Sequence, residues 1–554
     1  MKLKSFCIEN HSRLQDASIA VRDHLVLVGP NDVGKSSLIR CLDLLLGASA
    51  AQLYSRLGGE DFRDPRQPLV IEARLGDFSD PEKTLFADEI SVDPVSGTLS
   101  LKIRLEAVIE EGETLSIRRT GPDGGTGRQL SRDQLGSLGW KMIGAVASAR
   151  DLREDRSGTV DEILRAVDLG SEKDGFDAMV SKLQELLSGS VALGKLRGQL
   201  ATQLTRALPE KLSRDDLAFI PGAAATADVL SDVRLQVSRN GTQRNLTEQS
   251  DGMRALFAIA LYDLVSESAN IVAIDEPEIH LHPTSQRSLA RLLRGGRNQK
   301  IIATHSPDIV GAFSPESVVS VRPGGQLVQP QPGFLDEQER MLVHWWSRNK
   351  LEPLTAARIV AVEGAADRII LEKVAELTGR DLDRLCVAVI ETDGAGDMSA
   401  IITLFGPTGF QVPMSLLVDA DAKAETAEWL GVAEGDLAAS SAWVCDPDLE
   451  GEYVTALGAS AVWTAVTDCG LFSPAELANC APTGPGGSRT GADVADFCRR
   501  KKKAYKVRAA MAVADVLTPE AARLMRSIQS LLDEFAPESK EEPEETGEAE
   551  MAEK

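Results

Sequence analysis

The chain has 554 residues, 43% of them hydrophobic, which is enough for three or four domains with cores of their own. Its formal net charge of −24 excludes a globally basic field, so a nucleic acid would have to be met by local basic patches such as Arg499–Arg508 and arginines of the middle region. Seven cysteines without a CxxC pair argue against a zinc finger, and we find neither a signal peptide nor an apolar run of membrane-spanning length, so we expect a cytoplasmic protein.

The first motif is a phosphate-binding loop at Gly29–Ser36 (GPNDVGKS), which fits G-x-x-x-x-G-K-[ST] at every fixed position. An apolar strand is predicted at 24–28 and a helix at 37–46. Backbone N–H groups of such a loop and of the helix start bind phosphates. Lys35 is expected at the β/γ-phosphates and Ser36 at Mg²⁺. The predicted nucleotide-binding set here is Asn31, Gly34, Lys35, Ser36 and Ser37.

The region after this loop departs from a minimal nucleotide-binding domain. Residues 69–119 are rich in predicted strands, and Gln67 is only a candidate for a glutamine loop. Apolar residues at helical spacing predict helices at 160–167 and 176–187. Because the next ATPase motif lies far downstream, we predict an inserted helical arm at 155–215.

A segment at 249–256 (QSDGMRAL) opens an apolar helix. It resembles the signature loop of ATP-binding cassettes, normally LSGGQ, and retains Ser250 and Gly252, although Asp251 replaces a glycine and the leading leucine is missing. A plain turn is the alternative. A signature loop implies ATP sandwiched between two copies, so the resemblance implies a dimer.

The partner motif of the phosphate-binding loop follows a short buried strand at 271–274. Asp275 is placed to hold Mg²⁺ through water, and Glu276 to polarise the attacking water. A second strand at 300–303 ends before His305, which matches the switch histidine that contacts the γ-phosphate in cassette ATPases. A metal pair formed by His280 and His282 is an alternative that we disfavour.

Acidic residues follow two further apolar runs. Glu363 ends the run 357–362, and Asp419 and Asp421 end the run 413–418. Carboxylates at the ends of buried parallel strands project into the crevice where ligands bind. Hard cations prefer oxygen ligands, so three such acids predict a Mg²⁺ or Mn²⁺ site suited to phosphodiester chemistry. One isolated strand-end acid beside a solvated turn is the alternative.

These motifs together resemble the OLD (overcoming lysogenisation defect) family. The resemblance rests on the run 2–21, the strings GPNDVGKSSL, EPEIHLHP and ATHSPDIV, and the acidic domain that follows, and it covers roughly residues 1–515. Members are ABC ATPase–Toprim nucleases related to the nuclease subunit of the Gabija anti-phage system. The resemblance implies ATP binding and hydrolysis, metal-dependent DNA nicking or double-strand cleavage, and defence against phage or plasmids.

The resemblance also implies roles for individual residues. Glu363, Asp419 and Asp421 match the core Toprim acids, Asp367 matches an extra acid for a second metal, and Glu450 matches a later acid. The basic stretch 499–506 (RRKKKAYK) lies where the family places a lysine that stabilises the transition state. Lys503 and Lys506 are the candidates, and a solvated basic helix face is the alternative. The turn at 393–396 is either a further metal site or a plain turn.

The expected fold class is α/β: an SMC-like P-loop ATPase with an inserted helical dimerisation arm, followed by a C-terminal Toprim domain. The expected boundaries are 1–154 and 216–335 for the two ATPase halves, 155–215 for the insertion, 336–353 for a linker helix, 354–512 for Toprim, 513–532 for a C-terminal helix and 533–554 for an acidic disordered tail.

The expected partners are DNA, a second copy or a higher homo-oligomer, and a helicase or other defence protein. The rival function is an SMC-like DNA-repair clamp whose Toprim domain binds DNA without cutting, and the three retained core acids argue against it. A topoisomerase would need a strand-cleaving tyrosine in a recognisable cleavage domain, and a primase usually adds a zinc module; the sequence supplies neither. DNA preference, the effect of ATP on cleavage and the trigger are open at this stage.

Overall fold

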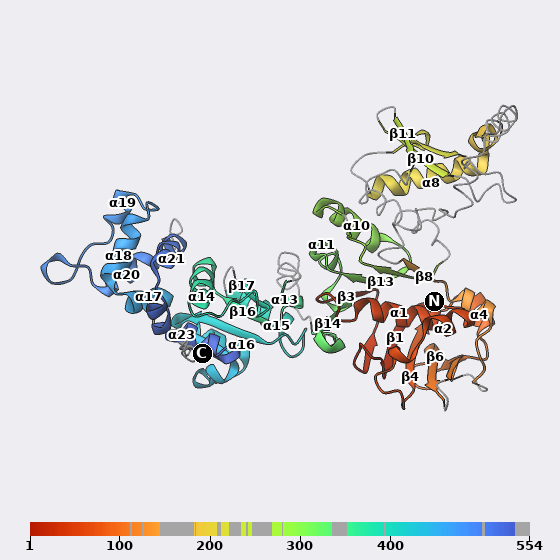
Figure 1. Ribbon diagram of the computed structural model, residues 1–554, viewed down its shortest axis with the longest axis horizontal. Coiled ribbons are helices and arrows are strands. Elements are labelled where there is room, and N and C mark those ends of the chain that lie inside the picture. The colour runs from red at the N-terminus through yellow and green to blue at the C-terminus, as the bar shows by residue number, and fades with distance from the viewer. Residues whose placement is uncertain are drawn as a thin grey trace, which may run out of the picture. The chain divides into compact units, whose positions relative to one another are not determined.

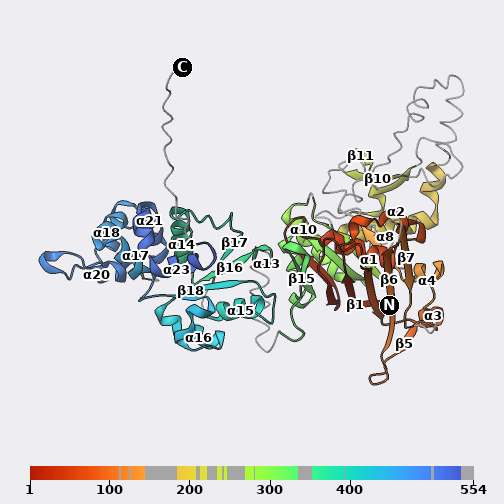
Figure 2. The ribbon, with the colours of Figure 1, turned by 60° about the horizontal axis from the view of Figure 1, so that its bottom comes forward.

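The computed structural model describes residues 1–110, 114–123, 127–143, 182, 184–207, 212–220, 234–239, 242–245, 269–279, 281–334, 352–392, 395–500 and 505–537. They form two compact units. The first is made by the described residues up to Pro332 together with 352–355, and the second by residues 333–334 and those from Ala356 onward. Figures 1 and 2 show the first unit in red to green and the second in green to blue.

A largely parallel sheet organises the first unit. Its strand order is β15-β14-β3-β13-β12-β8, and only the β14–β15 pair is antiparallel. The middle strands are buried along almost their whole length, as expected where both faces of a sheet are covered. The strands are β3 Leu25–Val28, β8 Trp140–Ile143, β12 Ile271–Asp275, β13 Gln299–Thr304, β14 Val318–Arg322 and β15 Gln326–Val328.

A second, antiparallel sheet shares a core with the first through helix α1 (Lys35–Leu46). Its order is β2-β1-β4-β6-β5, with β7 also paired to β6. Leu38 and Leu42 of α1 belong to one buried cluster with residues of both sheets. The strands are β1 Lys2–Glu9, β2 Ala17–Ala20, β4 Leu69–Gly76, β5 Ile90–Val92, β6 Leu99–Ile109 and β7 Leu115–Thr120, and the helices of this unit are α2 Ala50–Arg56, α3 Asp80–Leu85, α4 Arg132–Ser137, α10 Pro283–Gly295 and α11 Pro307–Val310.

The inserted region differs from an all-helical arm. Helix α8 (Val191–Ala207) is followed by a separate three-stranded antiparallel sheet of β9 Leu217–Ile220, β10 Arg234–Arg239 and β11 Thr242–Asn245. These strands pair with one another rather than with the ATPase sheet, and α8 contacts β9. The described part of the ATPase sheet therefore resumes at β12, not at residue 216. The predicted helix 160–167 lies outside the described residues.

A four-stranded parallel sheet forms the base of the second unit. Its order is β17-β16-β18-β19, with β16 Arg358–Val362, β17 Val387–Glu391, β18 Met414–Asp419 and β19 Ala442–Cys445. Helix α13 (Glu352–Thr355) belongs to the first unit, where it contacts β14. The helices of the second unit are α14 Ala365–Leu377, α15 Ala395–Phe405, α16 Lys423–Leu430, α17 Leu449–Leu457, α18 Ala459–Asp468, α19 Pro474–Leu477, α20 Gly491–Cys498, α21 Tyr505–Val516, α22 Pro519–Leu524 and α23 Arg526–Phe535. Most of the predicted linker helix 336–353 lies outside the described residues.

The C-terminal part differs from the expected single helix at 513–532 and tail from 533. Thr518 caps α22 and Pro519 occupies its first turn, so α21 ends at Val516 and a new helix begins. Helix α23 then continues to Phe535. It buries Ile528, Leu531 and Leu532. The first acidic residues of the expected tail therefore belong to a packed helix.

Candidate functional site

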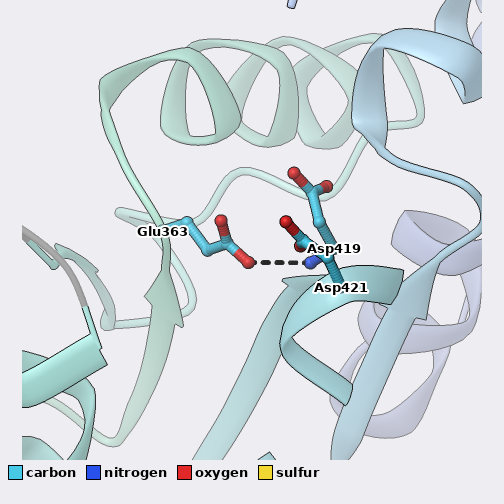
Figure 3. Close-up of side chains that lie close together, drawn as sticks. All are labelled: Glu363, Asp419 and Asp421. Carbon is cyan, nitrogen blue, oxygen red and sulfur yellow. Dashed lines mark hydrogen bonds between the residues drawn. The ribbon is translucent and has the colours of Figure 1, made fainter. Parts of the chain in front are cut away.

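Two strand ends bring the predicted metal-binding acids together in the second unit. Val362 of β16 lies opposite Leu417 of β18, so Glu363 and Asp419 leave the same edge of the sheet. The backbone N–H of Asp419 donates to Glu363 Oε1 at 2.9 Å. Carboxylate oxygens of Glu363, Asp419 and Asp421 all lie within 4.8 Å of one another (Figure 3). An oxygen-only set of this size fits Mg²⁺ or Mn²⁺.

A lysine from a distant helix completes this cluster. Lys506 of α21 places its Nζ 3.2 Å from Asp419 Oδ2 and 3.5 Å from Glu450 Oε2. The other oxygen of Asp419 accepts the backbone N–H of Leu449 at 3.0 Å. Lys506, one of the two candidate lysines, therefore lies beside the acids. Lys503, the other candidate, lies outside the described residues.

Burial sets the protonation of these groups. It raises the pKa of Asp367, which lies in the first turn of α14, to about 6, and the pKa of Glu450, only 1% exposed, to about 7. The pKa of Glu363 is also raised by burial. For Lys506, burial on its own lowers the pKa, but Glu450, Asp367 and Asp419 outweigh it and the pKa is raised. Asp367 and Glu450 are not part of the three-acid cluster, but both interact electrostatically with Asp419 and Lys506.

One supporting pair escaped the sequence analysis. Asp448 caps α17 by accepting the N–H of Gly451 at 2.8 Å, and Arg499 Nε lies 3.0 Å from its other oxygen. This pair anchors the start of the helix that carries Glu450. The available signal was the aspartate itself, because aspartate is a typical N-cap residue. In the stretch 393–396, helix α15 begins at Ala395, and the two preceding residues lie outside the described part.

The nucleotide motifs meet at the carboxyl edge of the first unit's parallel sheet. Gly34 has φ +114°, and a Cβ there would lie 2.7 Å from Leu14. Lys35 is 4% exposed and donates to the carbonyl oxygens of Gly29 and Pro30 at 3.0 and 2.7 Å. Burial lowers the pKa of Lys35. The loop therefore has the conformation that its glycines predict.

The second half of this site comes from β12 and β13. The pKa of Asp275 is raised by burial, and the hydroxyl of Ser36 hydrogen-bonds to this carboxylate. His305 Nε2 lies 3.5 Å from Glu276 Oε1, and burial lowers the pKa of His305. The groups expected to contact Mg²⁺, the attacking water and the γ-phosphate thus lie next to one another.

Among the other predicted residues, those that the structure describes make no contact that assigns them a role. Asn31 is exposed in the turn of the loop, Ser37 is half-buried in α1, and Gln67 is exposed before β4. Ser250, Gly252 and His280 lie outside the described residues. His282 is exposed and its ring nitrogen lies 3.3 Å from Thr284 Oγ1.

Each of the two units matches a known protein family. A family model described as "AAA domain, putative AbiEii toxin, Type IV TA system" (AAA_21) matches residues 25–311, more than half of the chain. One described as "Overcoming lysogenization defect protein-like, TOPRIM domain" matches residues 354–421, which contain the three-acid cluster. The chain belongs to the AAA_21 family. It combines this ATPase domain with a Toprim domain of the OLD-like type.

The curated relatives that the chain matches are named as nucleases. The chain is 24% identical over 429 residues to "OLD nuclease" of Thermus scotoductus, covering 72% of this chain and 79% of that protein. It is 22% identical over 486 residues to "Old nuclease" of Escherichia phage P2, covering 76% and 77%. It is 23% identical over 152 residues to "Endonuclease GajA" of Bacillus cereus, covering 26% of each. Among the described residues, we find no helix long and apolar enough to span a membrane.

Proposed function

We propose that this ATPase–Toprim protein is a DNA endonuclease that cuts at the cluster of Glu363, Asp419 and Asp421 with divalent metal ions bound there. The observation that carries the proposal is the convergence of these three carboxylates within 4.8 Å at the carboxyl edge of a parallel sheet. Bound Mg²⁺ or Mn²⁺ would supply an activated water and charge stabilisation for the leaving oxygen. Asp367 and Glu450 would help to hold a second ion.

Lys506 has a separate part in the proposal. Its ammonium group is held at 3.2 Å from Asp419 and carries a raised pKa, so it stays charged at neutral pH. A fixed positive charge beside the acids suits an interaction with the non-bridging oxygens of a scissile phosphate. This contact would offset the repulsion between the acids and the DNA backbone.

The first unit would bind ATP through Lys35, Ser36 and Asp275 and hydrolyse it with Glu276 and His305. Asn31, Gly34 and Ser37 belong to the same proposed nucleotide site. Ser250 and Gly252 would contact the nucleotide of a second copy, and the inserted region would hold the dimer together. ATP would then control access of DNA to the nuclease site. Defence against phage or plasmids, with a helicase or other partner protein, is implied by the resemblance to the OLD family and is part of the proposal.

Cleavage of supercoiled plasmid tests the nuclease site. The wild type with Mg²⁺ or Mn²⁺, with and without ATP, is expected to nick or linearise DNA, and Glu363→Gln to lose at least about a hundredfold in rate. The matched control is Glu391→Gln. Glu391 ends the neighbouring strand β17 but lies outside the cluster, so this variant should cut normally. Lys35→Ala, tested in parallel, shows how nucleotide controls cutting.

The opposite outcome favours the clamp. If no metal or nucleotide condition yields cleavage while DNA still stimulates ATP hydrolysis, the Toprim domain binds DNA without cutting it. Equal activity of Glu363→Gln and Glu391→Gln would place cutting at another site.

A further inference from the structure

The turns that follow β12 and β13 are joined at two points. The N–H of Glu276 donates to the carbonyl oxygen of Ala303 at 2.8 Å. Two residues further along the first turn, the Glu278 carboxylate accepts the backbone N–H of His305 through a short hydrogen bond. The two contacts bracket the Glu276–His305 pair, whose side chains lie 3.5 Å apart.

The Glu278 carboxylate sits in surroundings that disfavour a charge. Its Oε2 is buried and has no hydrogen-bond partner among the described residues. The N–H of His305 donates to Oε1, and the hydroxyl of Thr304 also hydrogen-bonds to the carboxylate. Glu276 adds a second negative charge nearby. A half-buried carboxylate beside another carboxylate lowers the stability of the fold. If position 278 served packing alone, an apolar residue would therefore be more favourable there. The geometry instead directs this carboxylate at the backbone of the switch histidine.

Glu276 itself has an unfavourable backbone conformation. Glu276 has φ +47°, which is unfavourable for a side chain larger than glycine. Such a backbone persists only where its surroundings hold it. The hydrogen bond from His305 to Glu278 closes the loop around this residue.

We propose that Glu278 is a positioning residue for ATP hydrolysis: its carboxylate fixes the His305 backbone and so holds the imidazole against Glu276. Glu278 touches neither nucleotide nor water in this scheme and acts through His305. The inference rests on the proposed roles of Glu276 and His305 in hydrolysis.

ATP turnover by matched variants tests this assignment. Glu278→Met removes the acceptor at similar size, and Glu278→Gln retains an oxygen that can accept the same N–H. We expect Glu278→Met to lower kcat for ATP about tenfold or more, the equivalent of one charge-assisted hydrogen bond, with KM for ATP within about twofold of wild type. Glu278→Gln should retain most of the activity.

A double variant separates positioning from general damage to the fold. If Glu278 acts only through His305, then Glu278→Met should slow the His305→Ala variant by less than about twofold. Additive losses, or equal losses for the Met and Gln variants, would overturn the inference while His305→Ala alone still supported the ATPase site. No hydrolysis by the wild type would overturn the ATPase assignment and this inference together.

Discussion

Buried carboxylates around Lys506 dominate the chemistry of the Toprim site. Asp367 and Glu450 have pKa values raised to about 6 and about 7 by burial, and both feel the negative charge of Asp419. Lys506 offsets only part of this repulsion. Divalent cations would neutralise more of it, so we expect metal affinity to rise with pH as these groups lose their protons.

Glu450 gives this account a stability test in metal-free protein. Its folded-state pKa is raised above the ordinary 4.5, so the stability associated with the protonated form is fully present below about pH 4.5 and is lost as pH rises through about 7. Glu450→Gln mimics the protonated form. We expect the free energy of unfolding of the variant to exceed that of the wild type by about 1–3 kcal/mol at pH 8 and to match it near pH 4.

Urea unfolding with a chelator present, at a series of pH values, measures this difference. If the free energies of unfolding of the wild type and Glu450→Gln differ by the same amount at every pH, Glu450 does not titrate in this range. A variant less stable than the wild type at pH 8 would mean that the ion pair with Lys506 outweighs the burial of Glu450.

At the scale of elements, strand ends explain which site residues were predictable. Runs of apolar residues mark β16 and β18, so Glu363 and Asp419 were found from their positions at the ends of these strands. Lys506 was one of two candidates, because the sequence of a basic stretch does not show which of its lysines will face the acids once the helix packs. Asp448 was missed, since its pairing with Arg499 joins residues that are distant in the chain.

The C-terminal helix shows a second limit of the sequence analysis. Composition alone favoured disorder from residue 533, because acids predominate there. In the structure, Asp533 pairs with Arg380 at 2.5 Å, and Glu534 lies 2.7 Å from Arg358. The partners of these acids come from earlier elements of the domain. A count of local charges therefore cannot reveal that the first acids of the stretch belong to a helix.

Glu534 should contribute measurably to the stability of the second unit. Its carboxylate accepts hydrogen bonds from Arg358, Ser415, Ser441 and Trp443, which ties α23 to the region around β16, β18 and β19. We expect Glu534→Ala to lower the free energy of unfolding by about 1–3 kcal/mol, because the buried hydroxyl of Ser415 and three half-buried donors lose a charged acceptor. Thermal unfolding should show this loss for Glu534→Ala but not for Glu428→Ala, an exposed acid of α16. Equal effects would mean that the contacts of Glu534 add nothing.

At the scale of the whole molecule, the net charge of −24 makes self-association an electrostatic cost. A dimer must therefore be held by specific contacts, and ATP between two ATPase units is the proposed one. When ATP and Mg²⁺ are added to the wild type, we expect sedimentation to show a larger fraction of dimer, or a lower dissociation constant where a dimer already exists. Lys35→Ala should not respond. A nucleotide response unchanged in Lys35→Ala would contradict the proposed ATP-dependent association.

Binding of Mn²⁺ in the absence of nucleotide tests the proposed three-acid metal centre most directly, and the electron paramagnetic resonance signal of the free ion measures it. We expect the wild type, Lys35→Ala and Glu391→Gln to bind Mn²⁺ equally. Glu363→Gln and Asp419→Asn should lose this binding together with DNA cleavage. Unchanged Mn²⁺ binding in both of these variants would contradict the assignment of the three-acid cluster as the metal centre.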